Sequence, residues 1–118
     1  MIVGIGIDVI EIKRVNERLG NRIFSLKEFE IWQKRKSIEF IAGRFALKEA
    51  FFKAIGTGIR DVDFKSISFV PDENGALYLE ENESVISLEN KYGFDFVHAS
   101  LSHDGGIAAA VVLLEKRM

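Results

Sequence analysis

The sequence contains no cysteine among its 118 residues. Without thiols the chain can form no disulfide, no thiolate metal site and no cysteine nucleophile. It has a single proline, Pro71, and no Ser/Gly-rich linker, so we expect one domain that spans residues 1–118. A chain of this length can bury a hydrophobic core without covalent cross-links.

Long hydrophobic runs and an excess of positive charge are also missing. The longest apolar runs, such as AAAVVLL, fall far short of the roughly 20 residues that a membrane-spanning helix needs. The first residues, MIVGIGIDVIEI, lack the basic region and cleavage site of a signal peptide, which predicts a cytoplasmic protein without a membrane partner. The net charge of −2 excludes a globally basic protein, so we expect no nucleic-acid partner.

The N-terminal residues combine a strand pattern with two glycines. Residues 2–7 alternate between apolar side chains and Gly4 and Gly6, which predicts a short strand with one bare face leading to Asp8. The bare face leaves room for a ligand or for close packing of another element. Glu11 lies three residues after Asp8, a spacing that predicts a capping box and a helix from Val9 to about Leu19.

The middle of the chain predicts two further helices and a hairpin. Ser25 and Glu28 form a second capping-box pattern, which opens a helix that runs to about Gln33. A long helix is expected from about Ser37 to Ile55, where Gly56 ends it. Two strands, at about 64–70 and 77–80, flank the hairpin signal Asn74-Gly75.

The C-terminal part predicts a helix from residue 82 or 84 to about 91 and strands at about 95–102 and 107–115. The last strand is apolar with little alternation, which predicts burial of both faces, inside the domain or against another subunit. The whole pattern indicates an α+β fold in which an antiparallel sheet packs on one long helix.

Glu49 is the most unexpected residue of the long helix. At 100° per residue, Ile38, Ala42, Phe45 and Phe52 form one apolar stripe, and Glu49 falls inside it. A carboxylate in apolar surroundings needs a cation, a metal or a proton. Lys53, four residues later, could make Glu49 part of an ordinary ion pair at the edge of the core.

Four polar clusters stand where the secondary structure does not require them. They are Asp8; Arg44, Lys48, Glu49 and Lys53; Gly56-Thr57-Gly58; and Ser100, Ser102, His103 and Asp104. Each alone can be read as a cap, a surface pair or a turn. Together, two carboxylates on separate elements without a His-rich or Cys-rich set suit Mg²⁺, and the nearby cations suit a phosphate-bearing ligand. Without a G-x-S-x-G elbow, the Ser, His and Asp residues do not predict a serine hydrolase.

Three segments carry a resemblance to a known family. GIGIDVIEIKRV, AGRFALKEAFFKAIGTGI and ASLSHDGGIAAAVV resemble, in order and spacing, the holo-[acyl-carrier-protein] synthases, the short-chain type of 4′-phosphopantetheinyl transferase. The resemblance covers nearly the whole chain. It implies an enzyme of fatty acid biosynthesis that transfers phosphopantetheine from coenzyme A to a serine of apo acyl carrier protein and releases adenosine 3′,5′-bisphosphate.

The resemblance also implies residue roles. Asp8 and Glu49 would bind Mg²⁺, and Lys53 would neutralise charge on the transferred phosphate or the leaving group. Arg14 would contact the acidic carrier protein. The implied coenzyme A contacts are Arg44, Gly56, Thr57, Ser102 and His103. The basic segment 34–36 is similar to the family's segment near the 3′-phosphate. The family further implies a homotrimer with active sites between subunits.

The sequence leaves two questions open. The proton of the carrier serine could pass to Glu49 directly or to a metal-bound water. The chain could also be a non-catalytic module that binds coenzyme A or acyl carrier protein, or a structural interaction domain. The joint presence of Asp8, Glu49 and Lys53 favours the enzyme, since a mere binding module is free to lose one of them.

Overall fold

The computed structural model describes residues 1–56 and 63–117. Its main sheet is antiparallel, with the strand order β1-β5-β4. These strands are Ile2–Glu11 (β1), Phe96–Asp104 (β4) and Ile107–Glu115 (β5). A two-stranded sheet pairs Phe69–Pro71 (β2) with Leu77–Leu79 (β3). The helical elements are η1 (Ile12–Arg14), α1 (Glu17–Ile23), α2 (Leu26–Arg35), α3 (Ile38–Ile55), η2 (Phe64–Ser66) and α4 (Glu83–Tyr92).

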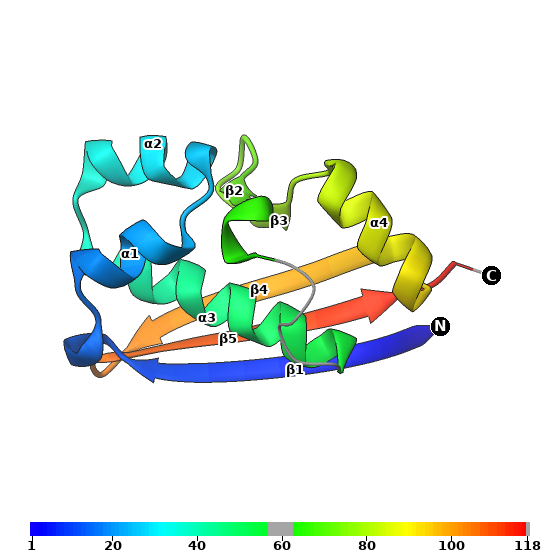
Figure 1. Cartoon of the computed structure of the whole chain (residues 1–118). Coiled ribbons are helices and arrows are strands. Elements are labelled where there is room, and N and C mark those ends of the chain that lie inside the picture. Colours follow the sequence, from blue (N-terminus) through cyan, green and yellow to red (C-terminus); the bar gives the residue numbers. More distant parts are fainter. Residues whose placement is uncertain (57–62, 118) are drawn as a thin grey trace.

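Helix α3 lies along one face of the main sheet, with α1, α2 and α4 on that same side of the sheet (Figure 1). The predicted α+β arrangement of an antiparallel sheet on a long helix is therefore confirmed. The helix begins after Ser37, whose Oγ accepts from the Phe40 N–H at 3.2 Å, and ends at Gly56 in the left-handed region. It is buried on most of its circumference, not along the single stripe that the spacing suggested, because the sheet covers one side and the shorter helices cover another.

The contact between α3 and β1 is close enough to exclude side chains from one strand face. A Cβ atom at Gly6 would lie 2.0 Å from the carbonyl oxygen of Ala50, and one at Gly4 would lie 2.2 Å from that of Ala54. The bare face of the strand therefore accommodates the helix backbone itself. Asp8 is the next residue along that face, so this packing brings its side chain to α3.

The predicted helix from Val9 to Leu19 is wrong. Strand β1 continues to Glu11 because its whole length pairs with β5, with Asp8 opposite Ala110 and Glu11 opposite Ile107. The Asp8 carboxylate bonds to Lys53 instead of capping a helix. The first α-helix starts at Glu17, where the side chain of Asn16 caps it by accepting from the Leu19 N–H.

One strand prediction also needs correction. Of the segment 64–70, only Phe69 and Val70 are in a strand, because Asp63 caps a 3₁₀ turn over Phe64–Ser66. Strand β5 was expected to be buried on both faces, inside the domain or against another subunit. Within the chain only the side that packs on α3 is fully covered, and burial of the other side against a subunit stays a prediction. Its other side belongs to a sheet face on which Ile5 and Ile7 of β1 remain 64% and 62% exposed.

Apart from the Asp8–Glu11 spacing, the local turn and cap signals were confirmed. Ser25 and Glu28 form the predicted capping box at the start of α2. The turn before β3 has Gly75 in the left-handed region, as its Asn-Gly sequence indicated. No helix in the described ranges is long and apolar enough to cross a bilayer. The cytoplasmic location and the single-domain organisation stay predictions.

Replacing Gly6 with alanine should separate α3 from β1. Its Cβ would collide with the Ala50 carbonyl, and forcing an extra methyl into such a contact typically costs about 1–3 kcal/mol. We therefore expect Gly6→Ala to lower the free energy of unfolding by about 3 kcal/mol in urea denaturation. Gly93→Ala is the matched control, since its Cβ would meet nothing and only the left-handed backbone opposes it. A Gly6→Ala protein as stable as the wild type would contradict the close packing.

Candidate functional site

Asp8 and Lys53 form the centre of the candidate site. Nζ of Lys53 donates to Oδ1 of Asp8 at 3.0 Å and to the Ile7 carbonyl at 3.1 Å. The Asp8 side chain is only 13% exposed, and its Oδ2 is buried without a hydrogen-bond partner in the described part of the chain. A buried carboxylate oxygen rarely stays unpartnered, so Oδ2 is a position where a ligand is expected to bind.

Glu49 lies beside this pair at the edge of the core, and it is half-buried. Burial raises the pKa of Glu49 above its ordinary value, the negative charge of Asp8 raises it further, and Lys53 opposes both. Two carboxylates that repel each other in this way are a typical cation-binding arrangement. Among the described residues, the ion pair of Lys53 is with Asp8 on the neighbouring strand, not within its own helix.

The donor set fits magnesium as a partial coordination shell. Asp8 and Glu49 supply hard carboxylate oxygens, which Mg²⁺ prefers, and Oδ2 of Asp8 has no other partner among residues 1–56 and 63–117. Residues 1–56 and 63–117 hold no group of three or more metal-binding side chains near one another. Mg²⁺ is commonly held by one or two carboxylates while water and substrate phosphates complete its shell. These two residues could therefore hold it together with a phosphate ligand.

Glu49 opens into a pocket of about 510 Å³ between α1, α3 and the segment around η2. The residues that line it are Leu19, Arg22, Ile23, Phe45, Glu49, Asp63 and Phe64. Its lining combines four apolar side chains with one cation and two carboxylates, and can take a ligand that has both apolar and charged parts. Asp63 and Phe64 were not among the predicted site residues, because no local pattern in the sequence indicates that the segment after α3 returns to Glu49.

His103 lies at the other end of α3. Its Nε2 is 3.1 Å from the carbonyl oxygen of Glu39, in the first turn of the helix. Glu49 is ten residues further on, about 15 Å along a helix axis at 1.5 Å per residue. His103 lines a different pocket, of about 690 Å³, at the turn between β4 and β5. Within one chain, His103 and the Asp8–Glu49 pair can meet only a ligand long enough to reach both.

The other predicted site residues are spread over the molecule. Ser102 pairs with Ala109 on the sheet face that turns away from α3. Gly56 caps the end of α3 near Lys53, and Arg14 is exposed at the end of η1. The predicted contact at Thr57 lies outside the described residues.

Arg44 is placed differently from what a ligand contact requires. Its side chain is buried, with Nε donating to the Phe69 carbonyl at 2.9 Å and the guanidinium 4.1 Å from the Phe40 ring centre. Burial lowers the pKa of Arg44 to about 10, which leaves it charged at neutral pH. A contact with coenzyme A would require this side chain to leave its internal partners.

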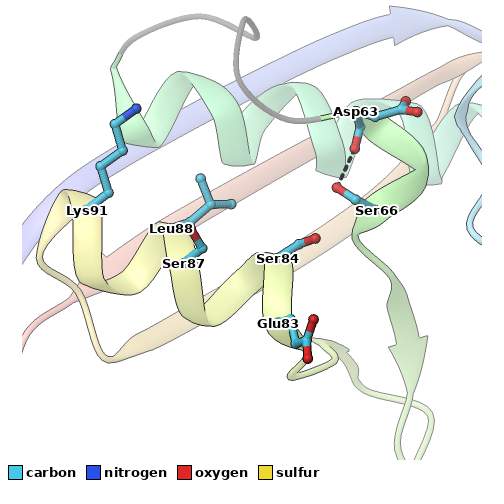
Figure 2. A pocket seen from close by; sticks show the side chains of 7 residues that line it. All are labelled: Asp63, Ser66, Glu83, Ser84, Ser87, Leu88 and Lys91. Atoms are coloured by element: carbon cyan, nitrogen blue, oxygen red, sulfur yellow. Dashed lines mark hydrogen bonds between the residues drawn. The ribbon is translucent and has the colours of Figure 1, made fainter.

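A further hollow lies between η2 and α4 (Figure 2). Its volume is about 390 Å³, and its lining is mainly polar. Ser66 donates to the Asp63 carbonyl at 2.6 Å on one side, and serines of α4 form the other side. None of the residues predicted for the site lines it, so we do not assign it to the same function.

Comparison with known proteins identifies the relatives of this chain. The 4′-phosphopantetheinyl transferase superfamily matches residues 4–112. A holo-[acyl-carrier-protein] synthase of Thermotoga maritima is 47% identical, and the alignment covers 99% of this chain but only 65% of that relative. The crystal structure of the Neisseria meningitidis holo-[acyl-carrier-protein] synthase superposes with a TM-score of 0.90 at 31% identity, covering 98% and 100% of the two chains. That of Bacillus anthracis, in complex with CoA (3′,5′-ADP), superposes with a TM-score of 0.82 at 39% identity, covering 99% of both.

The raised pKa of Glu49 predicts a pH-dependent effect of Glu49→Gln on stability. Between the ordinary value of 4.5 and the raised pKa, the folded protein binds more protons at this position than the unfolded chain. Wild-type stability therefore falls as the pH rises through that window. In metal-free buffer we expect Glu49→Gln to have a higher urea midpoint than the wild type above the raised pKa. The difference in urea midpoint between Glu49→Gln and the wild type should become smaller as the pH falls toward 4.5.

Glu39→Gln provides the control, because Glu39 is an exposed glutamate of the same helix. A constant difference between wild type and Glu49→Gln from acid to neutral pH would contradict the prediction.

Proposed function

The chain belongs to the 4′-phosphopantetheinyl transferase superfamily, and from that premise we propose that it transfers 4′-phosphopantetheine from coenzyme A to a serine of apo acyl carrier protein. The reaction would depend on Mg²⁺ and release adenosine 3′,5′-bisphosphate. The single observation that carries this proposal is the meeting of Asp8, Glu49 and Lys53, with the unpartnered Asp8 oxygen between strand and helix.

The proposed transfer forms one bond and breaks another. The serine hydroxyl oxygen of the carrier attacks the phosphorus next to pantetheine, and the bond from that phosphorus to the bridging oxygen of the pyrophosphate breaks. The serine gives up its proton, and adenosine 3′,5′-bisphosphate leaves with the bridging oxygen. Phosphoryl transfer of this kind depends mainly on positioning and on stabilisation of negative charge.

Lys53, Glu49 and Asp8 can supply both requirements. Lys53 is more than half exposed while it holds Asp8, so its ammonium can reach a phosphate in front of the strand. Glu49, with its raised pKa, is suited to take the serine proton, directly or through a water. Mg²⁺ bound by Asp8 and Glu49 would neutralise charge on the pyrophosphate.

The remaining contacts are those that the resemblance to the family implies. We propose that coenzyme A extends past Gly56 and Thr57 and meets Ser102 and His103. Arg44 stays a weaker proposal because it is buried. Arg14, exposed at the end of η1, would contact the acidic carrier protein.

We propose that the protein works as a homotrimer with the active site between subunits. The open face of the main sheet carries an exposed apolar surface on β1, made by Val3, Ile5, Ile7 and Val9. Large exposed apolar surfaces generally mark interfaces. In an assembly, His103 and Glu49 of the same site could also come from different subunits. Their separation within one chain would then not prevent them from contacting the same ligand.

A non-catalytic module that binds coenzyme A or acyl carrier protein is the alternative. Such a module has no need for a half-buried carboxylate next to a second one, which is costly for the folded chain. The three charged residues together therefore support the enzyme.

Substitution of the site residues tests the transfer. Apo acyl carrier protein, coenzyme A and Mg²⁺ are incubated with each variant, and mass spectrometry follows the gain of one phosphopantetheine group. We expect Asp8→Asn and Glu49→Gln to slow the transfer about a thousandfold, since each removes stabilisation of developing charge. Lys53→Met should slow it about a hundredfold. Lys27→Met changes an exposed lysine on α2 and should have no effect. Near-normal turnover of Asp8→Asn or Glu49→Gln would overturn the assignment.

Light scattering tests the trimer. The wild type should have three times the mass of the chain, and Ile5→Lys/Ile7→Lys should be monomeric and inactive because it places charges on the open sheet face. Leu26→Lys changes an equally exposed apolar residue away from that sheet, and it should stay trimeric and active. A monomeric wild type, or an active monomeric variant, is the result that excludes a site between subunits.

A further inference from the structure

Next to Glu49 the chain buries a charged residue that the proposed reaction does not use. Lys48 and its partner Glu28 have side chains that are both 0% exposed. Nζ of Lys48 donates to Oε1 of Glu28 at 2.5 Å, to the Ile23 carbonyl at 2.6 Å and to the Phe64 carbonyl at 2.8 Å. A lysine ammonium has three donors, so these bonds use its full capacity.

Both carboxylate oxygens of Glu28 also accept hydrogen bonds from the backbone. Oε1 of Glu28 accepts from the Ser25 N–H at 2.9 Å, and Oε2 accepts from the Phe69 N–H at 2.8 Å. The ion pair therefore joins the end of α1, the start of α2, η2 and β2 to one position of α3. Except for the local bond from the Ser25 N–H, these contacts join residues that are 16 to 41 positions apart along the chain, so no local pattern creates them.

The two carbonyls that Lys48 holds belong to walls of the pocket beside Glu49. Ile23 and Phe64 both line that pocket, and so do the residues just before them, Arg22 and Asp63. Glu49 follows Lys48 directly on α3. The lysine that bonds to both pocket walls and the carboxylate that lines the pocket therefore lie on the same helical turn. A shift of either wall would change the opening in front of Glu49.

Stability alone is a poor reason for such a pair. Removing two charges from water costs about as much as their attraction returns, and replacing a buried ion pair with uncharged residues is often neutral for folding. Directional bonds to two backbone carbonyls, in contrast, fix the position of both segments.

We propose that Lys48, together with Glu28, is a positioning residue that holds the α1 and η2 walls of the Glu49 pocket at the spacing which transfer requires. This inference rests on the proposed function for its kinetic consequence, whereas its structural consequence can be measured without any substrate. Lys48 touches neither coenzyme A nor the carrier serine in this assignment.

The test variant is Glu28→Gln/Lys48→Met, which removes both charges of the pair, so that neither partner is left buried without the other. Hydrogen exchange followed by mass spectrometry should show faster exchange at the amides of Phe24 and Ser66, at least tenfold, because α1 and η2 lose their anchor. Exchange in α4 and at the centre of the main sheet should be unchanged.

In the transfer assay kcat/KM should fall at least tenfold, with a rise in KM for coenzyme A or the carrier. Lys48→Arg, which keeps the charge and the donors, should recover part of the loss.

The matched control is Lys27→Met/Glu80→Gln. This variant removes a surface ion pair of the same 2.5 Å length, and neither residue lines the Glu49 pocket. It should match the wild type in both the exchange and the transfer measurement. Unchanged exchange at Phe24 and Ser66 in the test variant would overturn the proposal. A uniform rise over the whole chain would also overturn it, since that result marks general stability. If the wild type itself transfers nothing, the proposed function fails, and the exchange measurement still decides the role of Lys48.

Discussion

The approach of α3 to β1 is the constraint on which the rest of the site depends. The strand and helix backbones are so close that no side chain fits at Gly4 or Gly6. Asp8 follows Gly6 on the same face, and Glu49 precedes Ala50, the residue whose carbonyl Gly6 faces. The separation of the two carboxylates is therefore set by backbone packing, which is stiffer than any contact between flexible side chains.

The charged side chains of α3 point in different directions and therefore have different surroundings. Arg44 and Lys48 point inward, where carbonyl groups and a buried glutamate satisfy them. Glu49 lies at the boundary, and Lys53 reaches out to the strand. Because successive residues of a helix are rotated by about 100°, neighbours such as Lys48 and Glu49 can have unrelated environments. One helix thus serves as the main element of the core and as one wall of the site.

Sequence reasoning worked where the determining interactions were local. The capping box of Ser25 and Glu28 and the end of α3 at Gly56 need only neighbouring residues, and both predictions were confirmed. Asp8 and Glu11 show the same spacing as Ser25 and Glu28, yet pairing with β5, about a hundred residues later, keeps them in a strand. The sequence singled out Asp8 for the site, and that role stays a prediction, but the backbone conformation expected for Asp8 was wrong.

The remaining parts of the site could not be read from spacing. The Lys48–Glu28 pair joins positions 20 residues apart, and the pocket beside Glu49 uses Phe64 from beyond the end of α3. The sequence marked Lys48 only as one member of a basic cluster. Lys48 is buried because four other segments fold around it, and no periodic pattern in the sequence predicts this burial.

The order of the strands determines when this site can form during synthesis. Asp8 is made about a hundred residues before Ala110, which lies opposite it in the main sheet, and in the described residues its strand pairs only with β5. Ala110 leaves the ribosome after α3 with Glu49 and Lys53 has already emerged. Pairing of distant segments delays folding until both are available. A nascent chain therefore holds both carboxylates long before it can bring them together, and the Asp8–Glu49 arrangement forms only after β5 has been made.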